Sequence, residues 1–237
     1  MNKTLLSTTA TSLLLISTSV KADGPNIKFY GGAQAGGTFS KTNFKIDSHL
    51  NAGGLPVALI DQKLKQDTGD KFFIGGIFSG VRLLFGNFFT GFEAEANWDG
   101  MNIKIKAPIQ GTGEAWRLEL KRRYQLIPSI VMGWKMNEKT ALYGKLGAGI
   151  SKFTLAVDRG ARNENVRSRT VVHFVPAIGA EYELNQNSAL RLEVSGEIAG
   201  RPIKGDSEGP VNPIAVNQVS KARYSAISVK VGALFKI

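Results

Sequence analysis

The clearest pattern in the chain is the alternation of apolar and polar residues with a period of two. Within 88–98, the aromatic residues Phe88 and Trp98 share one side of the pattern, and Glu93 and Glu95 share the other. Successive residues of a β-strand point to opposite faces, so such a segment predicts a strand with one apolar and one polar face. Segments of this kind cover 27–40, 71–85, 88–98, 115–136, 141–155, 169–184, 189–200 and 221–237.

The links between these segments are short and long in turn. The short links are 86–87, 137–140 and 185–188, and they consist largely of turn-forming residues. The long links are 41–70, 99–114, 156–168 and 201–220. In an up-and-down barrel alternate links share one end, so the fold expected is an all-β, eight-stranded antiparallel transmembrane β-barrel with short periplasmic turns and long extracellular loops. The apolar run 55–60 leaves open a short helix or an extra hairpin, and the hairpin would give ten strands.

The polar faces carry charges of both signs, which is unlike the apolar interior of a soluble β-barrel. If these faces point inward, the charged groups must pair, because an isolated buried charge is costly. We therefore expect a lumen filled by an ionic network, which would limit a channel. The residues assigned to it are Arg82, Glu93, Glu95, Arg117, Glu119, Lys121, Arg123, Lys145, Glu181, Glu183, Arg191, Glu193 and Glu197. In the same alternation Arg122 falls on the apolar face. A charge on that face is tolerated near the lipid headgroups, where it costs much less than at the middle of the membrane.

Aromatic residues stand near the ends of the predicted strands on the apolar face. Their position is typical of the interfacial girdles of membrane barrels, although aromatic residues also favour strands in general. The residues assigned to a lipid-facing girdle are Phe29, Phe88, Trp98, Trp116, Trp134, Tyr182 and Phe235.

The first 22 of the 237 residues have the pattern of a secretory signal peptide. Lys3 gives a positive start, an apolar stretch includes 13–16, and cleavage is expected between Ala22 and Asp23. Residues 23–237 would then form the barrel domain. The formal net charge is +11, but the basic residues are spread along the chain without a nucleic-acid-binding motif, so no nucleic-acid partner is expected.

The sequence offers little chemistry for catalysis. It has no cysteine and only two histidines, His49 and His173, and neither belongs to a recognisable triad or metal-ligand cluster. We therefore expect no enzymatic activity and no cofactor. An outer-membrane lipid hydrolase is the enzymatic alternative, and it would depend on one of these histidines.

Several segments resemble the small outer-membrane β-barrel superfamily, which includes the OmpA transmembrane domain, OmpX-like proteins and alphaproteobacterial porin-family surface antigens. The matching segments are FGNFFTGFEAE at 85–95, the hairpin within 128–149, AIGAEY at 177–182 and LRLE at 190–193. The resemblance implies a barrel in the outer membrane of a Gram-negative bacterium. The partners it implies are outer-membrane lipid and lipopolysaccharide, the barrel-assembly machinery during insertion, and host surface molecules. The function expected is that of a surface protein whose barrel anchors extracellular loops and supports envelope integrity, with a narrow passive porin-like channel as the alternative.

Overall fold

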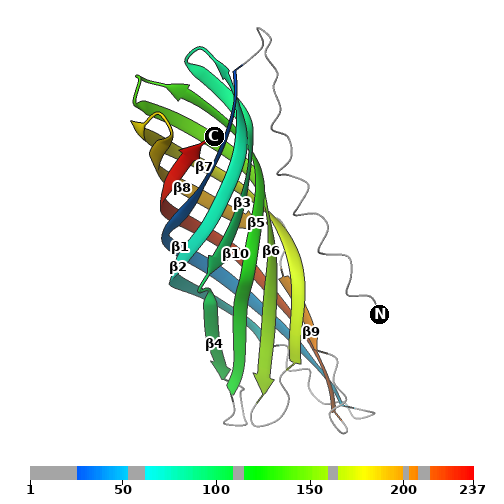
Figure 1. Cartoon of the computed structure of the whole chain (residues 1–237). Helices are drawn as coiled ribbons and strands as arrows, with labels where there is room; N and C mark the ends of the chain where they lie inside the picture. The colour runs from blue at the N-terminus through cyan, green and yellow to red at the C-terminus, as the bar shows by residue number, and fades with distance from the viewer. Residues whose placement is uncertain (1–25, 53–61, 109–114, 160–164, 200–202, 208–213) are drawn as a thin grey trace, which may run out of the picture.

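The computed structural model describes residues 26–52, 62–108, 115–159, 165–199, 203–207 and 214–237, and every regular element among them is a β-strand (Figure 1). The strands are β1 (Asn26–Ala52), β2 (Gln62–Phe85), β3 (Phe88–Asp99), β4 (Asn102–Pro108), β5 (Ala115–Lys135), β6 (Thr140–Arg159), β7 (Asn165–Asn185), β8 (Ser188–Ala199), β9 (Ile203–Ser207) and β10 (Ile214–Lys236). Within these ranges no helix is long and apolar enough to cross a membrane. The predicted signal peptide, with its cleavage site between Ala22 and Asp23, lies outside the described residues.

All of these strands are antiparallel and belong to one sheet that closes on itself. The order is β1-β2-β3-β5-β6-β7-β8-β10, and β10 pairs with β1 from Tyr30↔Lys236 to Ala52↔Ile214. β4 continues the path of β3 along β5, and β9 continues the path of β8 along β10. Counted in this way, eight strands complete the ring in the described part of the chain. The predicted antiparallel barrel is confirmed.

Three tight turns join strands at the rim where the chain ends. At the β2–β3 turn Gly86 has a φ of 60°, a left-handed conformation that a side chain would strain. At the β5–β6 turn the Asn137 side-chain oxygen accepts hydrogen bonds from the backbone amides of Lys139 and Thr140. The backbone amide of Ile237 donates to the carbonyl of Phe29 at the same rim. The described ends of the long links therefore lie at the opposite rim, as the sequence predicted.

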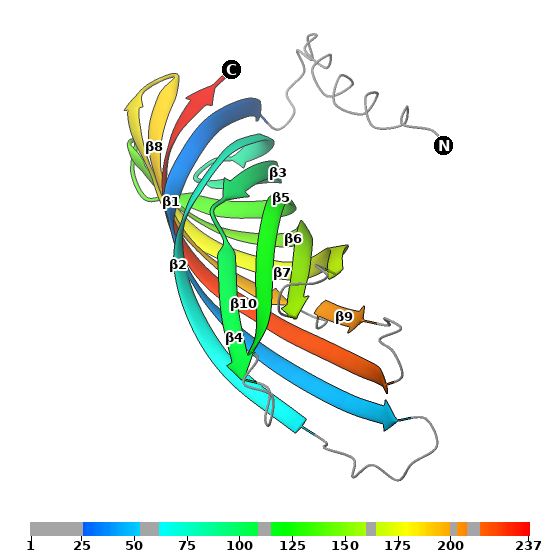
Figure 2. The same cartoon turned by 90° about the horizontal axis from the view of Figure 1, so that it is seen from below.

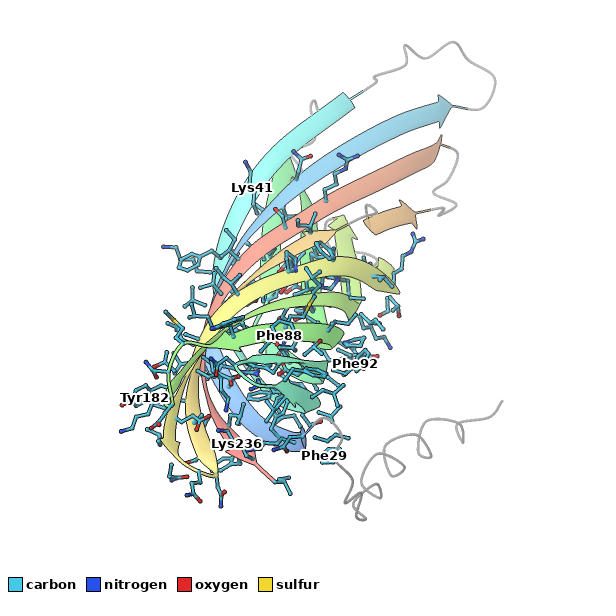
Figure 3. All side chains as sticks on the ribbon, turned by 90° about the horizontal axis from the view of Figure 1, so that it is seen from above. Phe29, Lys41, Phe88, Phe92, Tyr182 and Lys236 are labelled. Atoms are coloured by element: carbon cyan, nitrogen blue, oxygen red, sulfur yellow. The ribbon has the colours of Figure 1, made fainter. Side chains whose placement is uncertain are left out.

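The outer wall of the ring is apolar. Phe92 and Ile178 are 66% and 69% exposed, and Phe29, Phe92 and Tyr182 lie on this outer face (Figure 3). The inner face is closely packed, and aromatic rings lie directly across glycines of the neighbouring strand. Tyr143 faces Gly179 in this way, and a Cβ added to Gly179 would lie 2.4 Å from the tyrosine ring. Charged and aromatic side chains thus fill the interior, while hydrocarbon faces outward.

Several strands are longer than the sequence predicted. The ends of the expected link 41–70 extend β1 to Ala52 and start β2 at Gln62, and these two extensions pair with each other. No separate hairpin arises from the described parts of this link, while the apolar run 55–60 lies outside the described residues. Figure 2 shows β1, β2 and β10 extending past the other strands. The extensions are rich in polar residues, so the two-residue alternation that marks a lipid-facing strand is weak there.

Beyond the apolar wall the ring divides into two sheets. Pairing of β3 with β5 ends at Asn97↔Gln125, and pairing of β7 with β8 ends at His173↔Ala199. Further out, β9, β10, β1 and β2 form one paired group, and β4, β5, β6 and β7 form the other. Among the described residues, the ring is therefore closed only over the height that carries the apolar side chains.

Candidate functional site

The centre of the lumen holds an ionic layer built from six strands of the ring. Lys145 on β6 reaches three carboxylates: its Nζ lies 3.0 Å from Glu93 Oε1, 2.8 Å from Glu95 Oε2 and 2.8 Å from Glu193 Oε2. Lys230 on β10 lies 2.6 Å from Glu95 Oε1 and 2.8 Å from Glu193 Oε1. The two ammonium groups therefore share Glu95 and Glu193, one on each carboxylate oxygen.

Two arginines extend this layer toward the rim with the tight turns. Both terminal nitrogens of Arg82 lie 2.6 Å from the two oxygens of Glu181, which is a bidentate pair. Arg191 bridges Glu181 and Glu93, with its Nη2 at 3.0 Å and 2.7 Å from their oxygens. The hydroxyl of Tyr30 donates to Glu93 at 2.9 Å. Glu93 thereby connects the arginine pairs to the lysine pairs.

The ionic layer is electrically balanced and dry. It contains four cations and four carboxylates, and each of these residues is at most 7% exposed. Removal of one member of a buried ion pair leaves its partner uncompensated, so such a layer is stable only as a complete set. The carboxylate oxygens of Glu93, Glu95 and Glu193 lie within 4.8 Å of one another, as metal ligands would. Lys145, Lys230 and Arg191 already pair with these three carboxylates, so the arrangement is an ion-pair network.

A second buried cluster lies toward the rim with the long links. Arg122 on β5 forms ion pairs with Asp99 on β3 and with Glu197 on β8. His173 Nε2 lies 3.6 Å from Glu197 and 2.8 Å from the side-chain nitrogen of Gln125. These contacts of His173 are with a carboxylate and an amide, so they provide no activated nucleophile. The side chain of His49 lies outside the described residues.

The structure places most of the residues assigned to the lumen network inside the barrel. Those that are buried and paired there are Arg82, Glu93, Glu95, Lys145, Glu181, Arg191, Glu193 and Glu197. Glu183 lies at the rim with the tight turns, where it is partly exposed and pairs with Lys236 at 2.5 Å. The side chain of Arg117 lies outside the described residues.

Three residues assigned to the lumen lie elsewhere. Lys121 and Arg123 are exposed on the outer wall. Glu119 is partly exposed there, and its Oε1 forms an ion pair with Lys121 Nζ at 3.0 Å. The cause is a shift in the pairing of β5 with β6 between Arg122 and Gln125. A one-residue slip exchanges the two faces of a strand, so Arg122 points inward, opposite to the prediction.

The aromatic residues assigned to a girdle lie on the outer wall where they are described. Phe29, Phe88, Trp98, Trp134, Tyr182 and Phe235 are between 37% and 58% exposed. The side chain of Trp116 lies outside the described residues. Beyond this wall, toward the long links, the outer surface is basic: its partly or fully exposed cations in the described residues are Lys41, Lys71, Lys104, Lys121, Arg123, Lys152 and Arg223. Glu119 is a partly exposed acid of the same zone, whereas Asp70 pairs in register with the buried Ser40 and therefore belongs to the inner face. We call this zone the basic collar.

Sequence reasoning missed some members of the buried clusters. Tyr30, Tyr143 and Lys230 occupy inward positions of the alternation but carry no signal of their roles, because their partners come from distant strands. Tyr143 donates to Glu193 at 2.9 Å across 50 residues of sequence. Asp99 stands at the end of β3, where the alternation stops, so the pattern gave no face for it.

No protein-family model matches the chain, and no curated protein matches it significantly. Three solved structures to which the chain is similar are those of bacterial proteins. Neisserial surface protein A is 15% identical, with 90% of this chain and 99% of that chain covered and a TM-score of 0.42. The outer membrane protein OprG from Pseudomonas aeruginosa is 13% identical, with 87% of this chain and 96% of that chain covered and a TM-score of 0.43. The third structure is that of Ail, the attachment invasion locus protein of Yersinia pestis, in complex with the heparin analogue sucrose octasulfate. Ail is 14% identical, with 85% of this chain and 99% of that chain covered and a TM-score of 0.34. Through its own strand pairing and its inverted faces, the chain has the fold of a small outer-membrane β-barrel, the group that its sequence resembles.

Proposed function

We propose that the protein is a non-enzymatic surface protein of the bacterial outer membrane, whose barrel anchors an exposed basic end. The observation that carries this proposal is the inversion of the faces. Large apolar side chains such as Phe73 and Phe92 are 67% and 66% exposed, while Glu193 and Arg191 are 0% and 1% exposed. Water would penalise both arrangements, whereas lipid outside and paired charges inside favour both.

The closed ring supports the same proposal. Lipid cannot satisfy backbone amides and carbonyls, so a sheet in a membrane must have no unpaired edge. β1 and β10 complete the ring over the full height of the apolar wall. To reach the outer membrane the chain would use residues 1–22 as a signal peptide cleaved between Ala22 and Asp23, and then the barrel-assembly machinery.

The charge of the collar indicates the partners that this end of the barrel favours. The basic collar stands at the end with the long links, which faces outward in outer-membrane barrels. Its exposed cations attract polyanions through long-range electrostatics. The proposed partners at this end are lipopolysaccharide, through which the barrel would support envelope integrity, and anionic molecules of a host surface.

Heat-modifiability and cysteine labelling test this proposal together. In outer-membrane fractions the folded protein should migrate on a gel differently before and after boiling. Because the natural chain has no cysteine, single-cysteine variants report sidedness cleanly. In intact cells a membrane-impermeant maleimide should label Lys71→Cys in the basic collar, but should label Lys139→Cys at a tight turn only after permeabilisation. Equal mobility of both gel samples, or the reverse labelling pattern, would refute the proposal.

A further inference from the structure

The outer wall of the barrel has a notch at the junction of β3 and β4. It is a cavity of about 460 Å³, which falls within the range of about 300 to 1,000 Å³ for small-molecule sites. Its lining comes from the four strands β3 to β6 and includes Asp99, Asn102, Lys121, Arg123 and Thr154. The notch is separate from the central ionic layer of the lumen.

The notch exists because the wall is not paired at this height. Pairing of β3 with β5 ends at Asn97, and pairing of β4 with β5 begins only at Asn102. Between these positions the amide of Gly100 donates to the carbonyl of Phe73 on β2, at 3.2 Å, so the chain follows β2 before it crosses to β5. The β5 register shift between Arg122 and Gln125 lies directly opposite. Two irregularities therefore meet at one point and leave an opening.

The notch faces sideways, toward the surroundings of the barrel. Lys121 is paired in register with Asn102 on β4 and with Thr154 on β6, so these three side chains share one face of the sheet. Lys121 and Asn102 are exposed, which identifies this face as the outer one. Thr154 is only 8% exposed, and its hydroxyl shares a hydrogen bond with that of Ser168 at 3.1 Å. A ligand in the notch would approach along the outer wall and would not need to enter the lumen.

The height of the notch coincides with the edge of the apolar wall. Trp98 and Tyr124, which are 54% and 41% exposed, flank it on β3 and β5. On one side of these residues the outer wall is apolar, as at Leu126, and on the other side it carries the basic collar. Exposed tryptophan and tyrosine at this border are typical of the headgroup level of a membrane. The notch therefore opens where lipid headgroups lie.

The charges around the notch leave a net positive site. Its lining holds the cations Lys121, Arg122 and Arg123 against the carboxylates Asp99 and Glu119. Arg122 pairs with Asp99 and also with Glu197 outside the lining, and Lys121 pairs with Glu119 at 3.0 Å. Arg123 is exposed and has no ion pair with any residue that the structure describes. Its planar guanidinium fork is suited to two oxygens of one phosphoryl group. The exposed Asn102 side chain, which hydrogen-bonds Glu119, has a second amide N–H for the ligand.

We propose that this notch binds a phosphoryl group on the sugar headgroup of an outer-leaflet glycolipid, of the lipid A type. Arg123 and Lys121 hold the phosphoryl oxygens, and the exposed Asn102 offers a hydrogen bond to the sugar. The sideways opening at headgroup height favours a membrane lipid over a free phosphate ion. The proposal rests on the outer-membrane location proposed above, and it adds a defined site to the diffuse attraction of the basic collar.

Native mass spectrometry of the protein folded in detergent micelles tests the site. The probes are bisphosphorylated lipid A, the same lipid after enzymatic removal of its phosphates, inorganic phosphate and heparin. Arg123→Gln should weaken the binding of bisphosphorylated lipid A about tenfold, as expected for the loss of hydrogen bonds to a charged group. The matched control, Arg223→Gln, removes an exposed arginine of the same collar on β10 and should change affinity less than about twofold. Asn102→Ala provides a second variant that leaves the charge unchanged, and it should also weaken binding.

The outcomes separate the possible sources of the anion. Loss of affinity on removal of the phosphates, with no competition by inorganic phosphate, would support the proposal. Equal binding of inorganic phosphate, equal effects of the two arginine variants, or an Arg123 effect confined to heparin would overturn it. Fractionation that placed the protein outside the outer membrane would refute the proposed function, and the binding measurements with micelles would still report on the notch itself.

Discussion

Replacement of Lys145 by methionine should destabilise the barrel strongly. The Lys145 ammonium lies 3.0 Å from Glu93 and 2.8 Å from both Glu95 and Glu193, and it is fully shielded from solvent. Methionine keeps an unbranched side chain of comparable length, so packing changes little and the loss of charge dominates. The ionic layer would then hold four carboxylates and three cations.

The magnitude follows from the partners that remain. Lys230 still contacts Glu95 and Glu193, and Arg191 still contacts Glu93, so no carboxylate loses every cation. Even so, removal of one partner from a buried ion pair typically costs about 3–5 kcal/mol. Because each carboxylate keeps one cation, we expect the free energy of unfolding to fall by about 3 kcal/mol, the lower end of that range.

The assay is reversible urea unfolding in lipid vesicles, followed by tryptophan fluorescence and by the gel shift of the folded form. Lys121→Met is the control, because its ammonium is half exposed and pairs with the partly exposed Glu119. Its effect should stay within about 0.5 kcal/mol. Adding Glu95→Gln to Lys145→Met restores electrical balance and should recover part of the loss. Equal losses for Lys145→Met and Lys121→Met would refute the idea that the layer acts as a buried, complete set.

Three further predictions follow from the packing, the faces and the filled lumen. Gly179→Ala should destabilise the barrel by about 1–3 kcal/mol through overpacking against Tyr143, whereas Gly37→Ala, whose added Cβ meets no atom within 4 Å, should be nearly neutral in the same unfolding assay. In vesicles, a water-soluble maleimide should label Lys121→Cys quickly and Phe92→Cys hardly at all, and the reverse order would mean that the wall does not face lipid. Planar-bilayer recordings of the protein should show no conductance steps above background, because the buried ion pairs span the lumen, and regular steps would favour the channel alternative.

The alternation over the apolar wall was enough to predict the barrel and most of its lumen, because lipid imposes the same face on every residue of a given parity. Glu93 and Glu95 illustrate this, since their parity alone placed them inside. Parity fails where a strand slips. At 122–124 the sequence reads Arg-Arg-Tyr, so either register leaves a charge on each face, and only the pairing with β6 decides that Arg122 turns inward.

The pairing partners inside the lumen could not be predicted for a different reason. Strand parity gives the face of a residue, but the height and the direction of its side chain depend on the stagger of strands around the ring. Glu181 and Arg82 are 99 residues apart, yet they form a bidentate pair. The sequence indicated that the lumen holds roughly equal numbers of acidic and basic side chains. Which of these side chains form ion pairs was determined by the closure of the ring, where β1 pairs with β10.

The height at which the ring divides into two sheets has a physical cause. Inside lipid every backbone amide and carbonyl must be paired, whereas in water an exposed strand edge can be hydrated. The β3–β5 pairing stops at Asn97, next to Trp98, and the outer wall becomes polar from Asn102 onward. Beyond that point Lys71 on β2 and Lys104 on β4 place charges beside the free edges, which discourages pairing with another chain. The height at which strand pairing stops closing the ring therefore coincides with the height of the exposed aromatic residues. The first is set by backbone hydrogen bonding and the second by side-chain chemistry, so the two indicate the membrane border independently. The notch lies at that level because only there can the wall remain unpaired while its side chains still reach the lipid headgroups.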